Sequence, residues 1–171
     1  EAQHPGSVRV CTPPLGVYVS SHHPIARMPT VQPAEMSRCP IIALPAQTHL
    51  RNLVDDALAS VGISGCPIAM ETDMIDATRE GVLLGIGFAC VFKMAFAAAV
   101  AAGDVHLVPI SGPRFAIDIR QIIPYRHRQD REVIALADYL ASVIFRAAAG
   151  EPTNVSVPAG SRARKARTRA A

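Results

Sequence analysis

One glycine-rich stretch of the sequence could hold a phosphate group. Gly81, Gly85 and Gly87 lie within seven positions of the run GVLLGIGFACVF. A dinucleotide loop needs a strand, then the glycines, then a helix, because the free amides at the start of a helix attract the phosphate. Here the pattern predicts a helix over 73–84 before the glycines and a strand over 88–92 after them. A phosphate would therefore face the exposed carbonyls at the negative end of a helix.

The order of elements thus predicts a bend and not a nucleotide site. No Lys-Ser/Thr pair follows the glycines, as a Walker loop would require. We expect Gly85 to supply the left-handed cap of the helix, and Gly87 to permit a close approach of the strand that follows.

The titratable side chains form no catalytic or metal-binding pattern in the sequence. His22 and His23 are adjacent, so an extended chain points their side chains apart, which is poor geometry for a shared metal. Further along, His49, His106 and His127 have no Cys, Asp or Glu at ligand spacing. The acidic residues fall at predicted helix starts or exposed faces, and no Gly-x-Ser-x-Gly elbow occurs. The sequence predicts no catalytic residue, no metal site and no cofactor.

Composition and charge are those of a globular chain with a basic end. Of the 171 residues, 50% are hydrophobic and 18% are charged, which is typical of a folded domain. The net charge is +3, but the last eleven residues, SRARKARTRAA, hold five basic side chains and no acid, so residues 1–160 carry −2. An acidic body argues against a DNA-binding surface. We expect residues 148–171 to form a disordered basic tail.

Cysteine usage and hydropathy favour a cytoplasmic protein without a membrane partner. Cys11, Cys39, Cys66 and Cys90 lie 24 to 28 residues apart, with no Cys-x-x-Cys pair. This spacing fits free thiols in a reducing compartment, although the even count leaves disulfides open. No secretion signal is recognised at the start. The longest apolar run, residues 88–100, is too short to span a bilayer.

Strands and helices are expected to alternate along most of the chain. Apolar and β-branched runs predict strands over 15–21, 40–44, 66–72, 88–92, 105–110 and 114–126. Helical spacing predicts a turn at 34–38 and helices over 49–62, 73–84, 94–103 and 130–149. Thr48 is the expected cap of the helix after it, and Asp73 or Thr72 that of the next, whereas the proline-rich stretch 22–33 is predicted to be an extended loop. Such alternation predicts an α/β layer fold with a largely parallel sheet.

An ordered series of motifs over residues 15–146 resembles the effector-binding region of LysR-type transcriptional regulators. The series begins with the turn His-Pro-Ile-Ala at 23–26 and continues with Arg51 in a helix and Glu71 at a strand end. The glycine bend follows, and then VAAGDVHLVPISGP and a closing helix. The stretches LPAQTHLR and ETDM are similar to the nitrogen-assimilation type of these regulators. One departure is Phe92, which stands where the family usually has proline.

The resemblance implies a fold like that of the type 2 periplasmic solute-binding proteins, a Rossmann-like layered sheet with helices on both faces. Aligned to that plan, residues 1–14 are a leading segment. Residues 15–147 are then an effector-binding domain made of the second lobe and the closing part of an incomplete first lobe. On this alignment we expect the N-terminal winged helix-turn-helix of the family to lie outside these residues. Implied partners are a small-molecule effector, further copies of the chain in a homodimer or tetramer, and DNA only through that N-terminal domain.

Candidate effector residues follow from this fold, in which ligands bind between the lobes at strand ends and helix starts. The segment PAQTH, residues 45–49, follows a strand and opens a helix, so its amides and polar side chains could hold a carboxylate. Alternatively, Thr48 only caps the helix. The two phenylalanines of the strand after the bend could form an apolar wall, or at least one of them packs in the core. The candidates are Gln47, Thr48, His49, Thr72, Phe88 and Phe92.

The sequence therefore predicts an effector-sensing regulatory domain that binds a small anionic metabolite between two lobes and modulates transcription. The alternative is a solute-binding domain linked to transport, against which the lack of a recognised secretion signal counts. An α/β enzyme is disfavoured by the reversed order around the glycines and by the lack of a nucleophile or metal set.

Overall fold

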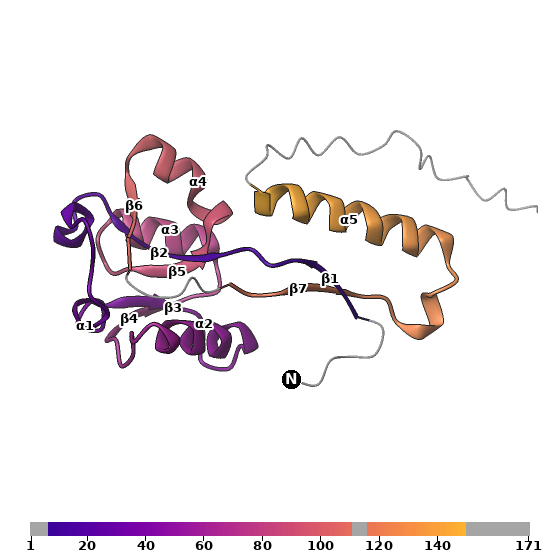
Figure 1. Cartoon of the computed structure of the whole chain (residues 1–171), viewed down its shortest axis with the longest axis horizontal. Coiled ribbons are helices and arrows are strands. Elements are labelled where there is room, and N and C mark those ends of the chain that lie inside the picture. Colours follow the sequence, from indigo (N-terminus) through magenta and orange to yellow (C-terminus); the bar gives the residue numbers. More distant parts are fainter. Residues whose placement is uncertain (1–6, 111–115, 150–171) are drawn as a thin grey trace, which may run out of the picture.

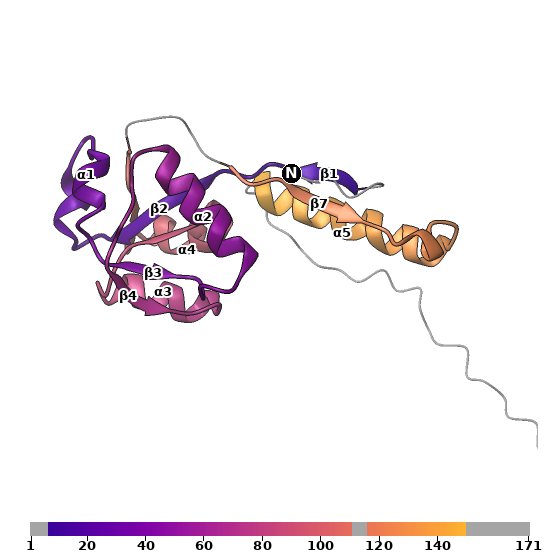
Figure 2. The ribbon, with the colours of Figure 1, turned by 90° about the horizontal axis from the view of Figure 1, so that it is seen from below.

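The computed structural model describes residues 7–110 and 116–149, which form two parts joined by a narrow connection (Figure 1). The main lobe comprises residues 15–110 and holds a sheet with helices on both faces. The strand–helix extension lies to one side of it in both views (Figures 1 and 2), and its described residues contain two strands, one long helix and the short 3-10 helix η2 (Tyr125–His127). The strands are β1 (Ser7–Cys11) and β7 (Ile119–Ile122), and the long helix is α5 (Arg131–Ala149).

The sheet of the main lobe is mixed, whereas the sequence predicted a largely parallel one. Its strands are β2 (Leu15–Ser20), β3 (Ile41–Ala43), β4 (Ile68–Glu71), β5 (Ala89–Phe92) and β6 (Val105–Leu107). β3 and β4 pair in parallel, and a parallel bridge between Ile41 and Phe88 links them to the β5 side. β2 pairs antiparallel with both β5 and β6. The resulting order is β4-β3-β5-β2-β6, in which β2 runs opposite to the other four described strands of the main lobe.

Helices cover the two faces of this sheet unequally. The 3-10 helix η1 (Pro24–Arg27), α1 (Pro33–Met36) and α2 (His49–Ser60) lie on one face, and α3 (Ile75–Leu83) and α4 (Lys93–Ala102) on the other. The side chains of β2 pack on both faces of the sheet, because successive side chains of a strand point to opposite faces. Val17 and Val19 pack in the core with α2, whereas Tyr18 stacks on Phe96 of α4 with ring centroids 5.0 Å apart.

Two antiparallel strand segments form the connection between the parts. Pro14 bridges Ala116, and the Thr12 hydroxyl donates a 2.7 Å hydrogen bond to Oδ1 of Asp118. Beyond these segments β1 and β7 pair antiparallel, with Val8 opposite Gln121, and α5 packs against β1. The two segments that connect the parts, residues 12–14 and 116–118, are therefore paired with each other.

The glycine bend is confirmed. Gly85 follows α3 with φ of 72°, in the left-handed region that favours glycine, and the chain then enters β5. Gly87 approaches the neighbouring strand closely, since a Cβ at this position would lie 2.7 Å from the Pro40 carbonyl oxygen. Main-chain bonds join the same segments, with the Phe88 amide donating to the Pro40 oxygen at 2.9 Å.

The predicted helices and strands of the main lobe are also present, with ends that differ by up to three residues and with further local differences. The proline-rich loop contains η1, in which the His23 Nδ1 accepts a hydrogen bond from the Ile25 amide. α3 begins at Ile75, two residues later than expected, and its N-cap is Met74. Neither of the predicted caps, Asp73 and Thr72, is therefore the N-cap of α3. The Thr72 hydroxyl instead accepts a 3.1 Å hydrogen bond from the Met74 amide and closes a local turn.

Differences at the chain ends arise from long-range pairing. β1 lies in the stretch predicted as a leading segment, and it is a strand because β7, whose residues lie 108 to 115 positions further along the chain, pairs with it. β7 spans only four residues of the long strand predicted over 114–126, where Pro124 removes a ladder donor. α5 extends to Ala149, and residues 150–171 of the predicted basic tail lie outside the described residues, as do residues 111–115.

Candidate functional site

A hollow of about 170 Å³ opens at the carboxyl ends of the parallel strands of the main lobe. Leu44 follows β3, Thr72 follows β4, and Phe92 ends β5, and all three line the hollow. α2, α3 and α4 begin directly after these strand ends. Most of the wall is apolar; its polar side chains are those of Arg51, Asp55, Thr72, Asp73 and Thr78. We call this hollow the strand-end cavity.

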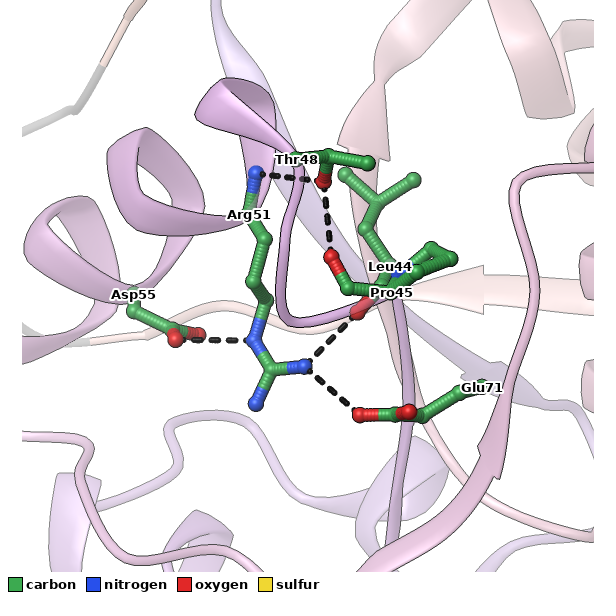
Figure 3. Close-up of polar contacts among 6 residues, drawn as sticks. All are labelled: Leu44, Pro45, Thr48, Arg51, Asp55 and Glu71. Carbon is green, nitrogen blue, oxygen red and sulfur yellow. Dashed lines mark hydrogen bonds and ion pairs between the residues drawn. The ribbon is translucent and has the colours of Figure 1, made fainter.

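Arg51 of α2 ties the strand ends together (Figure 3). Its Nη1 donates a 2.7 Å hydrogen bond to the Leu44 carbonyl oxygen and lies 3.2 Å from Oε1 of Glu71. Its Nε lies 2.8 Å from Oδ2 of Asp55, one helical turn further along α2. Only 14% of the Arg51 side chain is exposed. One guanidinium thus links the ends of β3 and β4 to the first turns of α2.

The guanidinium of Arg51 is charged, and its charge is compensated by two carboxylates of the protein. Partial burial acts to lower the pKa of Arg51, but the hydrogen bonds and charges of Asp55 and then Glu71 outweigh it, so the pKa is raised. Arg51 stays charged and is already paired with two carboxylates. It therefore serves as a brace of the cavity wall and not as a free binding group for an anion.

Replacing Arg51 with alanine is expected to lower the free energy of unfolding by about 2 kcal/mol. The change removes the donor of the Leu44 carbonyl and leaves Asp55 and Glu71 without their shared cation. Urea unfolding followed by circular dichroism would measure the loss. Arg38→Ala is the matched control, because Arg38 is exposed and its side chain makes no hydrogen bond or ion pair with any described residue. Equal stability of the two variants would contradict the bracing role.

The structure separates the predicted residues of the PAQTH segment from the cavity wall. The Thr48 hydroxyl accepts from the Arg51 amide at 3.3 Å and donates to the Pro45 carbonyl at 2.9 Å. Both hydrogen-bonding roles of this hydroxyl are thus used in capping α2. Gln47 and His49 are exposed beside it. These three residues do not line the cavity, although Arg51 and Leu50 just after them do.

Of the other predicted residues, two line the cavity and one does not. Thr72 and Phe92 come from different strand ends and meet at the cavity wall. Phe88 is 1% exposed and packs in the core, and it does not line the cavity. The alternative that at least one packs in the core is confirmed.

The starts of α3 and α4 add features that the sequence reading missed. Their N-cap residues, Met74 and Phe92, make no side-chain cap hydrogen bond. The first-turn amides of these helices therefore lack a side-chain cap acceptor, and Ile75 and Ala95 of the same turns line the cavity. The sequence contains a signal for this feature, because neither position 74 nor position 92 carries Ser, Thr, Asn or Asp, the usual capping residues.

Comparison with known proteins gives a consistent family. The sequence profile of the LysR substrate binding domain matches residues 2–144. A probable RuBisCO transcriptional regulator from Nostoc is 28% identical over 100 residues, which are 57% of this chain and 30% of that protein. Another from Cyanophora paradoxa is 33% identical over 94 residues, or 54% of this chain and 29% of that protein. The chain thus spans about a third of the length of these curated relatives.

Solved structures of the same class share the fold. The effector-binding domain of QuiR in complex with shikimate superposes with a TM-score of 0.63 at 18% identity, covering 83% of this chain and 67% of that one. The Synechocystis CcmR regulatory domain in complex with 2-PG gives 0.66 at 14% identity, covering 84% and 70%. Within the described residues, no helix is both long and apolar enough to cross a membrane.

Proposed function

This chain belongs to the LysR substrate-binding domain family, and on that premise we propose that it is the effector-sensing regulatory domain of a bacterial transcription regulator. A small metabolite binds at the strand-end cavity and shifts the equilibrium between arrangements of the lobes. Differential affinity for those arrangements is what passes the signal to transcription.

The position of the cavity carries this proposal. In open α/β sheets ligands bind outside the carboxyl ends of the strands, where helix starts present unpaired amides. The strand-end cavity has this position, with three strand ends and three helix starts around it. It lies on the side of the sheet where β2 begins, next to the crossing segments that lead to the extension. Leu15, the first residue of β2, lines the cavity, so a ligand there contacts the end of the main lobe from which the crossing segments leave.

The expected ligand is small and anionic, with an apolar body. The apolar wall favours the body, and the uncapped amides at the starts of α3 and α4 favour a carboxylate or phosphate group. Asp73 opposes this charge, since its exposed carboxylate lines the cavity without a hydrogen bond or ion pair to a described residue. Asp73 is therefore expected to limit affinity and to select against multiply charged anions.

The relatives disfavour the two other functions. They are transcriptional regulators and not enzymes, and the matched structures are effector-binding or regulatory domains. A role in solute transport has no support from either comparison. Further parts of the proposal are that effector domains pair into a homodimer, with a tetramer in the complete regulator. DNA is contacted through a separate helix-turn-helix domain, and the regulator acts in the cytoplasm.

Binding can be tested by nuclear magnetic resonance with shikimate and 2-PG as probes. The chain covers only 67% and 70% of the two matched effector domains, so we expect weak binding, with a Kd of about 1 mM or higher. Amide signals in the first turns of α3 and α4 should shift as either probe is added. Shifts confined to other elements, or none at about 10 mM of either probe, would contradict the proposal.

A charge change at Asp73 sharpens this test. Asp73→Asn removes the opposing carboxylate and should tighten binding of an anionic probe roughly fivefold. Asp56→Asn is the matched control, because Asp56 is an exposed carboxylate on α2 that does not line the cavity. Equal effects of the two substitutions would place the anion elsewhere.

A further inference from the structure

The tripeptide Cys-Pro-Ile occurs twice in the main lobe, at 39–41 and at 66–68. Each copy leads into a strand, the first into β3 and the second into β4. Because these strands are neighbours, the two copies lie side by side.

The register brings the two cysteines opposite each other. Ile41 pairs with Ile68 in the parallel ladder, and Cys39 and Cys66 each stand two residues earlier. A proline after each cysteine disfavours helical conformation at that cysteine. Cys39 lies in the bend that follows α1, where its amide donates to the Met36 carbonyl at 2.9 Å. The two thiols are close enough to interact electrostatically. The Ile41 amide donates to the Pro67 oxygen at 2.8 Å, which holds the two segments together.

Contacts to α1 support the same juxtaposition. The Cys39 thiol donates to the Glu35 carbonyl at 3.4 Å, and the Cys66 thiol donates to the Met36 carbonyl at 3.8 Å. These are consecutive carbonyls of one helical turn. Both cysteines are half-buried and pack against the same core cluster. Cys66 also lines an outer groove between α2 and β4, through which a small oxidant can reach the pair.

We propose that Cys39 and Cys66 are a modification site, at which a peroxide converts the two thiols into a reversible disulfide. One sulfur, as thiolate, attacks the peroxide oxygen, the O–O bond breaks, and a sulfenic acid and water form. The second sulfur then attacks the sulfenic sulfur, an S–S bond forms, and a second water leaves. Two thiols are oxidised by two electrons and one hydrogen peroxide is reduced to two waters.

The surroundings determine how this site behaves. Burial and then the neighbouring Glu35 raise the pKa of Cys39, and burial and then Cys39 raise the pKa of Cys66. Both thiols are therefore protonated at neutral pH, and oxidation should be slow there and accelerate by about tenfold per pH unit towards pH 9. No group of three His, Cys, Asp or Glu side chains occurs among the residues described, so a metal centre does not compete for the pair.

The disulfide would lie at the amino ends of β3 and β4, opposite the strand-end cavity. It would close a loop that contains α2 and restrict the unfolded chain. We expect oxidation to raise the Tm by roughly 5–10 °C and to leave the cavity open. This inference does not depend on the identity of the effector.

Peptide mapping can test the proposal, because trypsin places each cysteine in a different peptide. Cleavage after Arg38 and Arg51 releases Cys39 in residues 39–51, and Cys66 lies in residues 52–79. The reduced 171-residue chain is treated with hydrogen peroxide at pH 7 and pH 9, and free thiols are then blocked before digestion. We expect a linked pair of these peptides that a reductant separates, together with the rise in Tm. Cys39→Ser and Cys66→Ser should each abolish both, whereas Cys11→Ser should retain both.

Three outcomes would overturn the proposal. One is a linked peptide that joins other cysteines, or disulfide-linked dimers without the internal bridge. Another is overoxidation of Cys39 and Cys66 to sulfinic acids with no linked peptide. A third is a bridge that forms only after the chain is unfolded in urea, which would show that the folded geometry does not bring the thiols together.

Discussion

Phe88→Ala is expected to lower the free energy of unfolding by about 4 kcal/mol. The side chain is 1% exposed and packs in the core cluster with β2, β3 and α2. Its removal leaves a cavity at the place where the β3–β4 pair meets the other three strands. The Phe88 amide and carbonyl both bond to the Pro40–Ile42 segment, so the surrounding main chain has little freedom to collapse into the space.

Phe92→Ala is the matched control for this result. Phe92 is half-buried at the strand-end cavity, and its removal should cost about 1 kcal/mol. We expect the reverse ranking in ligand titrations, where Phe92→Ala weakens binding of an apolar-bodied probe. Chemical denaturation monitored by circular dichroism, together with the same titration, would measure both quantities. A larger stability loss from Phe92→Ala would contradict the assignment of Phe88 to the core.

Gly87→Ala is expected to destabilise the protein by about 3 kcal/mol. An added Cβ would lie 2.7 Å from the Pro40 carbonyl oxygen, a main-chain atom that is held by the Phe88 amide. The strands must separate to admit the methyl group, and the bridge between β3 and β5 is weakened as a result. A thermal melt of the variant at fixed pH would measure the loss.

Gly85→Ala separates this crowding from conformational strain. Gly85 has φ of 72° and open space around its Cα, so alanine there pays only for the left-handed conformation, about 1 kcal/mol. We therefore expect Gly87→Ala to be the more damaging substitution. If Gly85→Ala were worse, the close approach of the two strands would not be the reason for the second glycine.

The local pattern of residues determined the elements of the main lobe and the direction of the glycine bend. Helical spacing placed α2, α3 and α4, and a run of β-branched residues between prolines placed β3. These signals act within a few residues of each other, through main-chain hydrogen bonds and side-chain alternation. The Thr48 cap is of the same kind, since its partners are Pro45 and Arg51.

Only the tertiary structure decided which residues form the candidate site. Phe88 and Phe92 are equally apolar in the sequence, yet one is enclosed by the core and the other lies at the strand-end cavity. β1 is a strand only because β7 lies beside it, and Arg51 is a brace only because Glu71 reaches it from another strand. Such contacts join segments far apart in the chain. The free energy of such contacts depends on which surfaces meet and how much water they exclude. Neither can be predicted from the spacing of residue types within one segment.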